Sequence, residues 1–549
     1  MSRMPHKVAV DLTPILPGGE NGGAKIFVLD LMRQLAEMAP STEFILLTQA
    51  ASHDELSSLE GSNVRRKMVL GPITEAHVRT RIGGLASRIG SRVPSRLARA
   101  INRVRRRLGS QLQRRRPRSL LRDLGIDLLF CPFTAPTYCE PGIPTVCTIY
   151  DLQYKTYPEF FSPEDVVHRA NTFSDAARRA TALAAISDYS RQSAITHGEI
   201  DPSRIQTIHL RLARRISPEA GQDTSVLERL GLVPARYLVY PANFWKHKNH
   251  EMLLTAFGIA CRGGQLPGDI KLVCTGAPGE RRDWLMAAAL TMGLGERVVF
   301  PGYLPNLELA SVISHSAGVV FPSLYEGFGL PVIEAMAADV PVACSNIASL
   351  PEVAANAAIM FDPRIPADIA RAMATLVGDE AQRQQLVEAG RRRAEEFSDT
   401  KRMAREYWAL FCSALADFRH ENLIMGVTVD GWVGDSLKIQ AAPLTGARSV
   451  EVQISAPEWL PRRSITVRAY REGRLEGAPL DLKRGTDAVM SLPIDGAGGH
   501  FELHFTPTFV PARCGLGDDQ RELSALLQRC SIVAENSSRI ELYPESTVA

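Results

Sequence analysis

The feature that most constrains the fold is a strand, a Gly-rich turn and a helix in immediate succession. The apolar run that begins at Ala317 is typical of a buried parallel strand, and Ser323-Leu-Tyr-Glu-Gly-Phe-Gly-Leu-Pro-Val-Ile-Glu-Ala-Met-Ala follows it. Pro331 suits the first turn of a helix, because its ring fixes φ and it has no N–H. Such a turn directs free N–H groups and the positive end of the helix dipole towards an anion. The flanking carboxylates of Glu326 and Glu334 would bind hydroxyl groups of the same ligand, so the pattern predicts a nucleotide-sugar site.

Short apolar runs alternate with helical patterns through the first 420 residues. This alternation is typical of doubly wound α/β domains with parallel sheets. We predict two Rossmann-like domains, residues 1–215 and 216–420, the second closed by a returning helix in the strongly helical stretch 367–418. The predicted strands are 7–12, 42–48, 127–132, 144–152, 182–187 and 205–210 in the first domain, and 236–240, 270–275, 298–300, 318–321 and 340–343 in the second.

After residue 420 the pattern changes to period-two alternation, with Gly, Pro and Asp turns between the runs. This is typical of antiparallel strands that bury one face. We therefore predict a third domain, an antiparallel β-sandwich over residues 421–549, with Trp432 in its core rather than on a sugar-binding surface. The clearest strands are 449–455, 464–470, 500–505 and 539–543.

The composition indicates neither a membrane span nor a disulfide framework. No run approaches the roughly 18 apolar residues that a spanning helix needs, and the N-terminal residues enter a strand pattern without a signal-peptide core. The nine cysteines are scattered without a tight pair, which favours reduced thiols in a cytoplasmic protein.

The positive charge is concentrated in one segment. Residues 79–122 contain fifteen arginines and no Lys, Asp or Glu, so the rest of the chain carries a formal charge of −12 although the whole chain carries +3. Within 82–112 an apolar stripe at helical spacing, with arginines off the stripe, predicts a basic amphipathic helix that Pro94 kinks or divides. Such a helix favours an anionic membrane surface, where each Arg contributes roughly 1 kcal/mol. The alternative is a stripe packed on the protein with a solvated basic face. Nucleic acid is disfavoured, because no aromatic residues are interleaved.

In the second half, cationic and N–H groups converge on the carboxyl ends of the predicted strands, where doubly wound folds bind ligands. Lys246 and Lys248 follow the first strand of this half, and a lysine there can contact a diphosphate as a point charge. The N–H groups of Phe328, Gly329 and Leu330 would reach the same phosphates. Together these groups would stabilise the charge that develops on a leaving nucleoside diphosphate.

The string around the two glutamates closely resembles glycosyltransferase family 4, and it looks like that of bacterial mannosyltransferases that build surface polysaccharides. These are retaining enzymes of the GT-B fold, so the resemblance implies an α/β GT-B protein with two facing Rossmann-like domains, here with a β-sandwich appended. It spans roughly residues 7–418. The segments that carry it are Ser323–Ala337, Pro341–Val353, Gly302–Leu309, Lys248–Asn249, Ala185–Arg191 and Thr148–Tyr154.

The resemblance implies roles on the donor side. Glu334 corresponds to the carboxylate that binds the nucleotide ribose, and Glu326 to the one that contacts the donor hexose. Lys248 corresponds to the diphosphate lysine, with Lys246 as a second cation nearby. The remaining predicted donor-binding residues are the phosphate turn Gly327, Phe328, Gly329 and Leu330, the base-binding edge Tyr303 and Leu304, and Gly276.

The chain departs from the family at two positions. A His-Asp pair usually follows the strand that corresponds to Pro144–Ile149, and this chain has Tyr150 and Asp151 there. The family's His is thought to contact the transferred sugar. We therefore count Tyr150 and Asp151, with Glu326 and Lys248, as the candidate catalytic residues. Many members also have an Arg six residues before the lysine, where this chain has Ala242.

A Gly-rich loop over residues 17–25 lies on the acceptor side. It contains Gly22 and Gly23 but no GxGxxG fingerprint. It is either a turn that lets the acceptor approach the backbone closely or a plain loop.

These features lead to the hypothesis of a retaining hexosyltransferase that moves mannose from GDP-mannose to a lipid-linked or growing surface polysaccharide. Its partners would be the nucleotide sugar, the glycan acceptor and an anionic membrane surface bound through 82–112, with no nucleic acid, cofactor or metal. It would lie peripherally on the inner face of the cell membrane. One alternative stays open, a catalytically silent GT-B-like assembly partner tethered to the membrane. A GT-B-fold isomerase is disfavoured, because the Glu-Gly-Phe-Gly-Leu-Pro string resembles that of the transferases.

Overall fold

The computed structural model describes residues 4–17, 22–71, 120–212, 224–418, 422–428, 430–442, 444–471, 473–494, 498–517, 519, 521–535 and 538–543. The amphipathic stretch predicted at 82–112 lies outside the described residues, as does the rest of the Arg-rich segment 79–122 except its last three positions. The chain divides into two compact units, which are described separately. The first is Met1–Arg81, Asp127–Thr137 and Pro144–Ala416, and the second is Ile82–Ile126, Tyr138–Ile143 and Asp417–Ala549.

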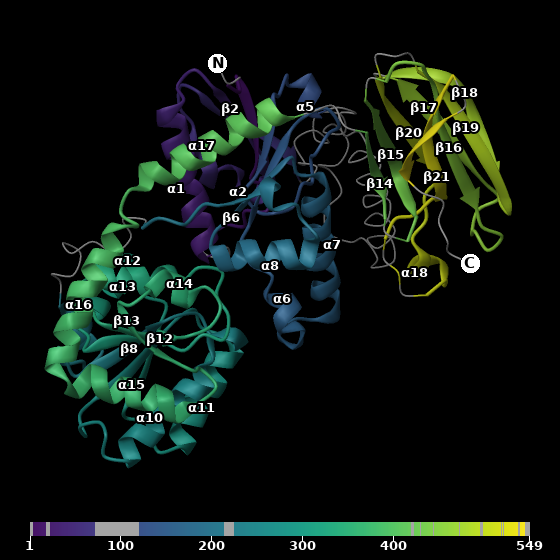
Figure 1. The fold of residues 1–549 in the computed structure, drawn as a ribbon. Coiled ribbons are helices and arrows are strands. Elements are labelled where there is room, and N and C mark those ends of the chain that lie inside the picture. Colours follow the sequence, from purple (N-terminus) through teal and green to yellow (C-terminus); the bar gives the residue numbers. More distant parts are fainter. Residues whose placement is uncertain are drawn as a thin grey trace, which may run out of the picture. The chain divides into compact units, whose positions relative to one another are not determined.

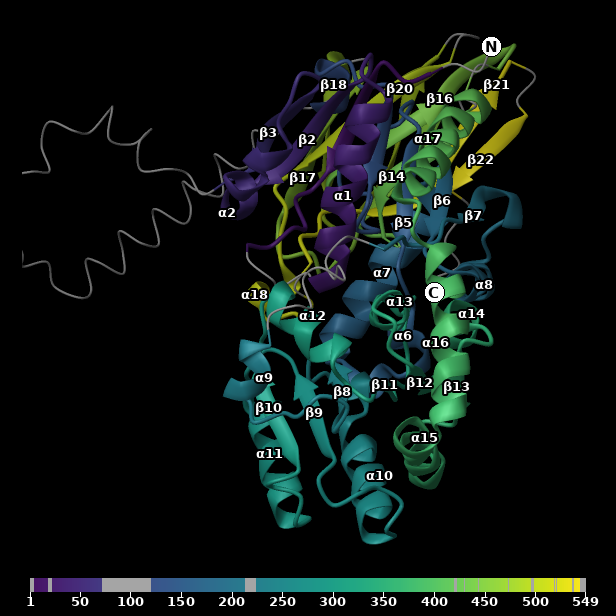
Figure 2. The same cartoon turned by 90° about the vertical axis from the view of Figure 1, so that its left-hand side faces the viewer.

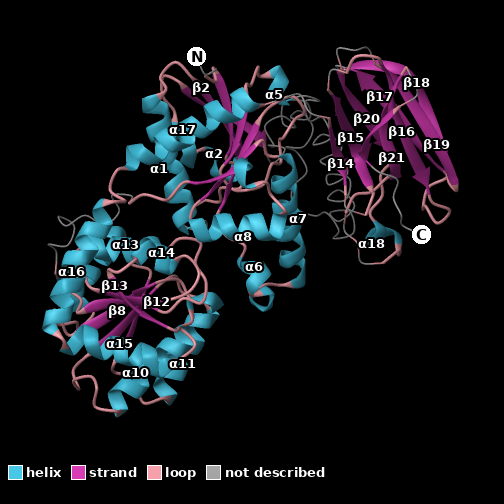
Figure 3. Ribbon diagram, in the orientation of Figure 1, coloured by secondary structure: helices cyan, strands magenta, loops and turns pink. Residues whose placement is uncertain are grey.

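The first unit contains two parallel sheets, each flanked by helices (Figure 3). The first sheet has seven strands in the order β3-β2-β1-β4-β5-β6-β7. Strands β4 and β5 are buried along their whole length, which explains why they read as unbroken apolar runs. The strand order reverses beside β1, and the carboxyl end of such a strand is where doubly wound sheets bind ligands. The strands are β1 (Lys7–Asp11), β2 (Glu43–Gln49), β3 (Val64–Leu70), β4 (Leu128–Cys131), β5 (Thr145–Ile149), β6 (Ala182–Ala185) and β7 (Ile205–Thr207).

The second parallel sheet has six strands, which Figure 2 shows in the order β10-β9-β8-β11-β12-β13. The central strands β8 and β11 pair in register, with Val319 opposite Val239, and both are fully buried. The order reverses at this pair, so the loops after β8 and β11 lie at the topological switch point. The strands are β8 (Tyr237–Pro241), β9 (Lys271–Thr275), β10 (Val298–Gly302), β11 (Gly318–Phe321), β12 (Val342–Ser345) and β13 (Ala358–Phe361).

Helix α17 (Thr400–Asp417) follows the second sheet in the chain but packs on the first. Its Tyr407 hydroxyl lies 3.1 Å from Thr148 Oγ1, and its ring contacts Phe27 and Phe130, which belong to α1 and β4. Helices α17 and α1 accordingly lie side by side in both Figure 1 and Figure 2. After the second sheet, the last helix of the first unit thus packs against the first sheet.

The other helices of the first unit lie between successive strands, except α15 and α16, which follow β13 and lead to α17. Those beside the first sheet are α1 (Gly22–Met38), α2 (Ala50–His53), η1 (Glu55–Leu59), α6 (Gln153–Thr156), η2 (Pro158–Phe160), α7 (Pro163–Arg179), α8 (Asp188–Gly198) and η3 (Pro202–Arg204). Those beside the second sheet are α9 (Ser225–Arg229), η5 (Lys246–Lys248), α10 (His250–Arg262), α11 (Glu280–Thr291), α12 (Asn306–Ser314), α13 (Leu330–Ala337), α14 (Leu350–Ala354), α15 (Pro366–Gly378) and α16 (Glu380–Glu395).

The second unit is a sandwich of two antiparallel sheets, in the strand orders β14-β15-β20-β17-β18 and β19-β16-β21-β22. Inward-facing residues of both sheets form one apolar core, which includes Trp432, 9% exposed. The short helices α5 (Leu120–Asp123) and α18 (Pro511–Cys514) belong to this unit. The strands are β14 (Leu423–Val427), β15 (Val433–Ala441), β16 (Ala447–Ala456), β17 (Ser464–Arg471), β18 (Arg474–Lys483), β19 (Thr486–Pro493), β20 (Gly499–Thr506), β21 (Leu526–Ala534) and β22 (Arg539–Tyr543).

The predicted fold class is confirmed, with some differences in the elements. Strand β3 was missed because Arg65, Arg66 and Lys67 interrupt its apolar pattern, which an edge strand tolerates. Strand β18 was missed because it contains Gly477 and Pro479. Helix α1 begins at Gly22, four residues earlier than its apolar periodicity predicts. Among the helices that the structure describes, none combines the length and apolar character needed to cross a bilayer.

Candidate active site

The loop between β11 and α13, residues 322–329, is the centre of the candidate donor site. Gly329 has a φ of 116°, a left-handed conformation that favours glycine, and a Cβ there would lie 2.6 Å from Leu350. Pro331 falls in the first turn of α13, as predicted. Within the described part of the chain, no group accepts a hydrogen bond from the four N–H groups of Gly327–Leu330. These groups are therefore free to bind an anion.

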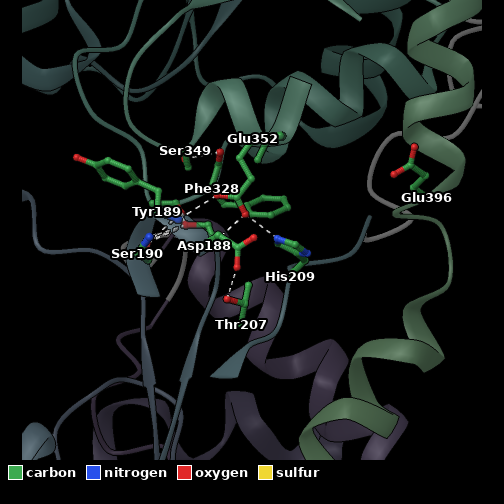
Figure 4. Close-up of polar contacts among 12 residues, drawn as sticks. Asp188, Tyr189, Ser190, Thr207, His209, Phe328, Ser349, Glu352 and Glu396 are labelled. Carbon is green, nitrogen blue, oxygen red and sulfur yellow. Dashed lines mark hydrogen bonds and ion pairs between the residues drawn. The ribbon is translucent and has the colours of Figure 1, made fainter. Parts of the chain in front are cut away.

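The carbonyl side of the loop is held by serines from both halves of the first unit. Ser349 Oγ lies 2.9 Å from the carbonyl oxygen of Glu326 and 2.7 Å from that of Phe328 (Figure 4). Ser187 Oγ donates to the carbonyl of Gly327 at 2.7 Å. The C=O and N–H of a trans peptide point in opposite directions. Anchoring the carbonyls therefore turns the intervening N–H groups the other way, towards a ligand.

Gly327 also brings the loop 322–329, called the donor loop below, against the loop after β5 of the first parallel sheet. A Cβ at this position would lie 2.5 Å from the carbonyl oxygen of Tyr150, so only glycine allows the observed approach. The same Tyr150 carbonyl accepts a hydrogen bond from Ser190 Oγ at 2.7 Å. The loop after β5 and the loop after β11 are thus held in contact.

Two predicted catalytic residues form an ion pair. Lys248 Nζ lies 2.6 Å from Glu326 Oε1, and the two side chains are 11% and 12% exposed. The residue after Lys248, Asn249, has a φ of 61°, and its amide donates to the carbonyl of Pro322 at 3.1 Å. This bond fixes the end of η5 to the donor loop. Lys246, at the start of η5, is exposed.

Asp151 lies within electrostatic reach of this pair. Burial raises the pKa of its carboxyl, Glu326 acts in the same direction, and Lys248 and the N–H of Gln153 oppose the shift. Its Oδ1 accepts that N–H at 3.1 Å. Three of the four residues predicted to be catalytic therefore come together.

Tyr150, the fourth, packs its ring into an aromatic cluster. The ring meets Phe27 edge-on at 6.1 Å and stacks on Phe133 at 6.4 Å. Its hydroxyl is buried and has no hydrogen-bond partner among the described residues, and burial raises the pKa of this hydroxyl well above its ordinary value. A buried hydroxyl left unpaired costs about 1–3 kcal/mol. The side chain thus contributes packing, and its hydroxyl keeps an unused hydrogen-bonding capacity.

The other donor-side predictions fall at buried and exposed positions. Glu334 is buried in α13, whereas Tyr303 is exposed after β10 and Leu304 beside it is buried. Gly276 donates its N–H to the carbonyl of Gly302 at 3.0 Å. A Cβ on Gly276 would lie 2.7 Å from a carbonyl of the loop after β8, so this glycine packs strand ends together. The roles of these residues towards a donor stay predictions.

The acceptor-side glycines lie in a helix. Gly22 and Gly23 form the start of α1, and residues 18–21 before them lie outside the described residues. The sequence prediction placed both in a loop, which is wrong for these two positions because the helix extends further towards the N-terminus than its apolar stripe.

Asp11, which sequence reasoning missed, ends β1 beside the reversal of the strand order. Its Oδ1 accepts the N–H and the hydroxyl of Thr13 at 3.0 and 2.6 Å. Its Oδ2 is buried with no partner among the described residues. Burial raises the pKa of this carboxyl from 3.8 to about 6. No sequence motif marks it, since its burial depends on the packed sheet.

A second polar cluster joins Asp188, His209 and Glu352 (Figure 4), whose ligand-type atoms all lie within 4.8 Å of one another. This spacing would suit a metal ion. However, the two oxygens of Glu352 accept the N–H groups of Asp188 and Tyr189 at 2.7 and 3.0 Å. His209 Nε2 lies 2.6 Å from Glu352 Oε1, and the Asp188 carboxylate accepts the hydroxyl of Thr207. We interpret the cluster as a hydrogen-bonded junction between the two halves.

Sequence reasoning assigned no role to the serines or to Glu352. They lie in the segments Ala185–Arg191 and Pro341–Val353, which carry part of the family resemblance. A signal was present in Ser349-Leu-Pro-Glu352, which has the spacing of a capping box. That motif predicts a helix start but not the contact with another helix.

The fold and the site together define a GT-B glycosyltransferase architecture. The family model "Glycosyl transferases group 1" matches residues 231–393, so the chain carries a group 1 glycosyltransferase domain, and the resemblance predicted from the sequence is confirmed. The O-antigen chain mannosyltransferase B of Escherichia coli is 28% identical over 258 residues, covering 46% of this chain and 66% of that protein. The serotype-specific mannosyltransferase WbdA of Escherichia coli is 30% identical over 248 residues, covering 43% of this chain and 29% of that protein. The chain thus spans less than two thirds of these relatives.

Solved structures agree with this architecture. HepE of Anabaena, in complex with UDP and glucose, superimposes with a TM-score of 0.52 at 16% identity, covering 74% of this chain and 98% of that one. At this identity the likeness establishes the fold alone.

The Lys248–Glu326 pair gives a test that separates stability from ligand binding. Lys248→Ala leaves Glu326 unpaired in a largely buried site, so we expect it to lower the free energy of unfolding by up to about 3 kcal/mol. Lys248→Ala/Glu326→Gln removes the stranded charge and should recover much of the melting temperature. Nucleoside diphosphate binding, measured by calorimetry, should be lost in both. A double variant that binds as well as wild type would contradict the role of the lysine.

Asp11 predicts a pH dependence of stability. Its folded pKa of about 6 lies above the ordinary 3.8, so ionisation is disfavoured in the folded state and stability is lost as the pH rises from about 4 through about 6, by about 3 kcal/mol in all. Asp11→Asn should remove this loss, so its melting temperature relative to wild type should rise between pH 4.5 and 7. Asp201→Asn is the control, because the N–H and hydroxyl of Ser203 lower the pKa of that carboxyl. An unchanged difference for Asp11→Asn would contradict the assignment.

Proposed function

We propose that the protein is a retaining hexosyltransferase that binds a nucleotide sugar at loop 322–329 and transfers its hexose to a glycan acceptor. The observation that supports this most is the arrangement of the loop peptides. The N–H groups of Gly327–Leu330 have no protein acceptor in the described chain, whereas the carbonyls on the other side are hydrogen-bonded. Preorganised N–H groups of this kind stabilise charge on a leaving diphosphate.

Lys248 and Glu326 would change partners when the donor binds. In the structure they neutralise each other at 2.6 Å. A diphosphate beside the loop would attract the ammonium of Lys248, since charge-assisted contacts to phosphate are strong. The Glu326 carboxylate would then be able to accept hydroxyl groups of the hexose. The pair thus holds two substrate-binding groups in place before the substrate arrives.

The transfer step needs no protein base in this proposal. The bond between the anomeric carbon and the phosphate oxygen breaks, and the acceptor oxygen bonds to the same face of that carbon. The acceptor's proton passes to the departing phosphate oxygen, so charge and atoms balance. Asp151, whose pKa is raised by burial, would serve as a hydrogen-bonding group for the sugar. The N–H groups and Lys248 would supply the positive charge, and we propose that no metal or cofactor is needed.

We propose mannose from GDP-mannose as the transferred sugar, and a surface polysaccharide or its lipid-linked precursor as the acceptor. The names of the relatives support the mannose, and the O-antigen chain mannosyltransferase B supports a polysaccharide acceptor. A screen of GDP-mannose, UDP-glucose, UDP-N-acetylglucosamine and dTDP-rhamnose, read by thermal shift and turnover with and without EDTA, tests this. We expect GDP-mannose to stabilise the protein and to turn over equally in EDTA. Glu334→Ala should abolish transfer, with Glu388→Ala on the surface of α16 as a control. Turnover of Glu334→Ala at the wild-type rate would contradict the donor-site assignment.

A second candidate is a catalytically silent GT-B-like assembly partner. Tyr150 favours it, because the family's sugar-contacting His is replaced by a side chain that packs among aromatic rings. Transfer or donor hydrolysis by the purified wild-type protein in the same screen would exclude this candidate. Binding of every donor without turnover would support it.

We further propose that the protein is cytoplasmic and binds the inner face of the membrane peripherally through residues 82–112. The proposal rests on composition, since fifteen arginines lie within 79–122 with no acidic residue. In flotation assays, the full chain should bind phosphatidylglycerol liposomes and release at high salt, because exposed charge contacts are screened. Deletion of 82–112 should abolish flotation, and neutral phosphatidylcholine liposomes are the control. Undiminished binding after the deletion would contradict the proposal.

A further inference from the structure

Glu352 connects helix α14, beside the second parallel sheet, to helix α8, beside the first. It belongs to α14, and its two carboxylate oxygens accept the first N–H groups of α8, those of Asp188 and Tyr189, at 2.7 and 3.0 Å. Burial alone would raise the pKa of Glu352, but the hydrogen bonds from His209 and from the two N–H groups lower it below its ordinary value. An ionised carboxylate at this end of α8 also interacts favourably with the helix dipole.

The residues that begin these same two helices hold the donor loop. Ser187 is the N-cap of α8 and donates to the carbonyl of Gly327 at 2.7 Å. Ser349 is the N-cap residue of α14, and its hydroxyl binds the neighbouring carbonyls of Glu326 and Phe328. Glu352 has the spacing to Ser349 at which a capping-box glutamate would reach back to its own helix. Here it reaches the first N–H groups of α8 instead. It thereby connects the two helices whose N-cap residues are Ser187 and Ser349.

His209 adds a third connection between the junction and the loop. Its Nε2 lies 2.6 Å from Glu352 Oε1, and its ring lies 5.9 Å from the ring of Phe328 (Figure 4). Arg393 of α16 donates to the backbone carbonyls of Glu352 and Val353 at 2.7 and 2.9 Å. Two hydrogen bonds from α16 therefore hold the backbone of α14.

We infer that Glu352 is a positioning residue of the donor site, a role that rests on the proposed function. By joining α8 to α14 it keeps Ser187 and Ser349 on adjacent carbonyls of one loop, which directs the loop N–H groups to the diphosphate. Without the carboxylate, α8 separates from α14 and Ser187 no longer holds Gly327. Ser349 still holds the carbonyls of Glu326 and Phe328, but the peptide between Gly327 and Phe328 loses its anchor. A diphosphate must then order this peptide on binding, which weakens its affinity.

The test compares Glu352→Gln, Glu352→Asp and the control Glu396→Gln in the full chain. Glu396 pairs with Arg393 but makes no hydrogen bond or ion pair with α8 among the described residues. Titration calorimetry with GDP and with UDP, well below the melting temperature, gives the affinity. Hydrogen exchange at the amides of residues 188 and 189 reports the junction independently of any nucleotide.

We expect Glu352→Gln to weaken binding of the nucleoside diphosphate about tenfold and to accelerate exchange at 188 and 189. Glu352→Asp should recover part of both, and Glu396→Gln should match wild type. Faster exchange with an affinity within twofold of wild type would overturn the positioning role, because the junction would then be merely structural. Unchanged exchange would overturn the junction itself. If wild type bound neither GDP nor UDP while exchange still responded to Glu352→Gln, the donor assignment would fail, and the positioning role with it.

Discussion

The proposed donor site depends on the hydrogen bonds to the carbonyl oxygens of residues 326–328. A turn with free N–H groups would by itself adopt many peptide orientations, and ordering it when the ligand binds would reduce affinity. Here Ser187 and Ser349 occupy the carbonyl side before any ligand is present. Because each peptide is planar, fixing the carbonyl also fixes the N–H of the next residue. Hydrogen bonds on the carbonyl side of the loop thus orient the N–H groups of the proposed anion site.

This construction requires both halves of the first unit. Ser349 precedes α14, which lies beside the second parallel sheet. Ser187 precedes α8, which lies beside the first. Gly327 permits the contact, since a Cβ would lie 2.5 Å from the carbonyl of Tyr150. Helix α17 then returns the chain to the first sheet, where Tyr407 packs on Phe27 and Phe130. The proposed phosphate-binding turn is therefore held by Ser349 from its own half and by Ser187 from the other.

These dependencies explain what the sequence could and could not predict. Apolar periodicity predicted both parallel sheets and the sandwich, because buried strands impose it directly. It failed at β3 and β18, whose edge positions tolerate charge, Gly and Pro. It also did not identify β13 or the sandwich strands β14, β15, β19 and β21. The resemblance pointed to Lys248 and Glu326, but their ion pair joins residues 78 positions apart and follows from the fold. Asp11 was missed because an aspartate at the end of a strand is typical of a turn, and its burial depends on the folded sheet.

The substitution of Tyr150 for the family's His is best understood by separating the backbone of this residue from its side chain. The carbonyl of Tyr150 is held by Ser190 and meets Gly327, and these contacts do not depend on which side chain is present. The ring, in contrast, is taken up by Phe27 and Phe133. The contact between the loop after β5 and the loop after β11 therefore rests on the backbone of residue 150, and the proposed loss concerns only the polar side-chain contact. Asp151, next in the chain, lies within electrostatic reach of Glu326 and Lys248 and is a polar side chain that this loop still presents to the pair.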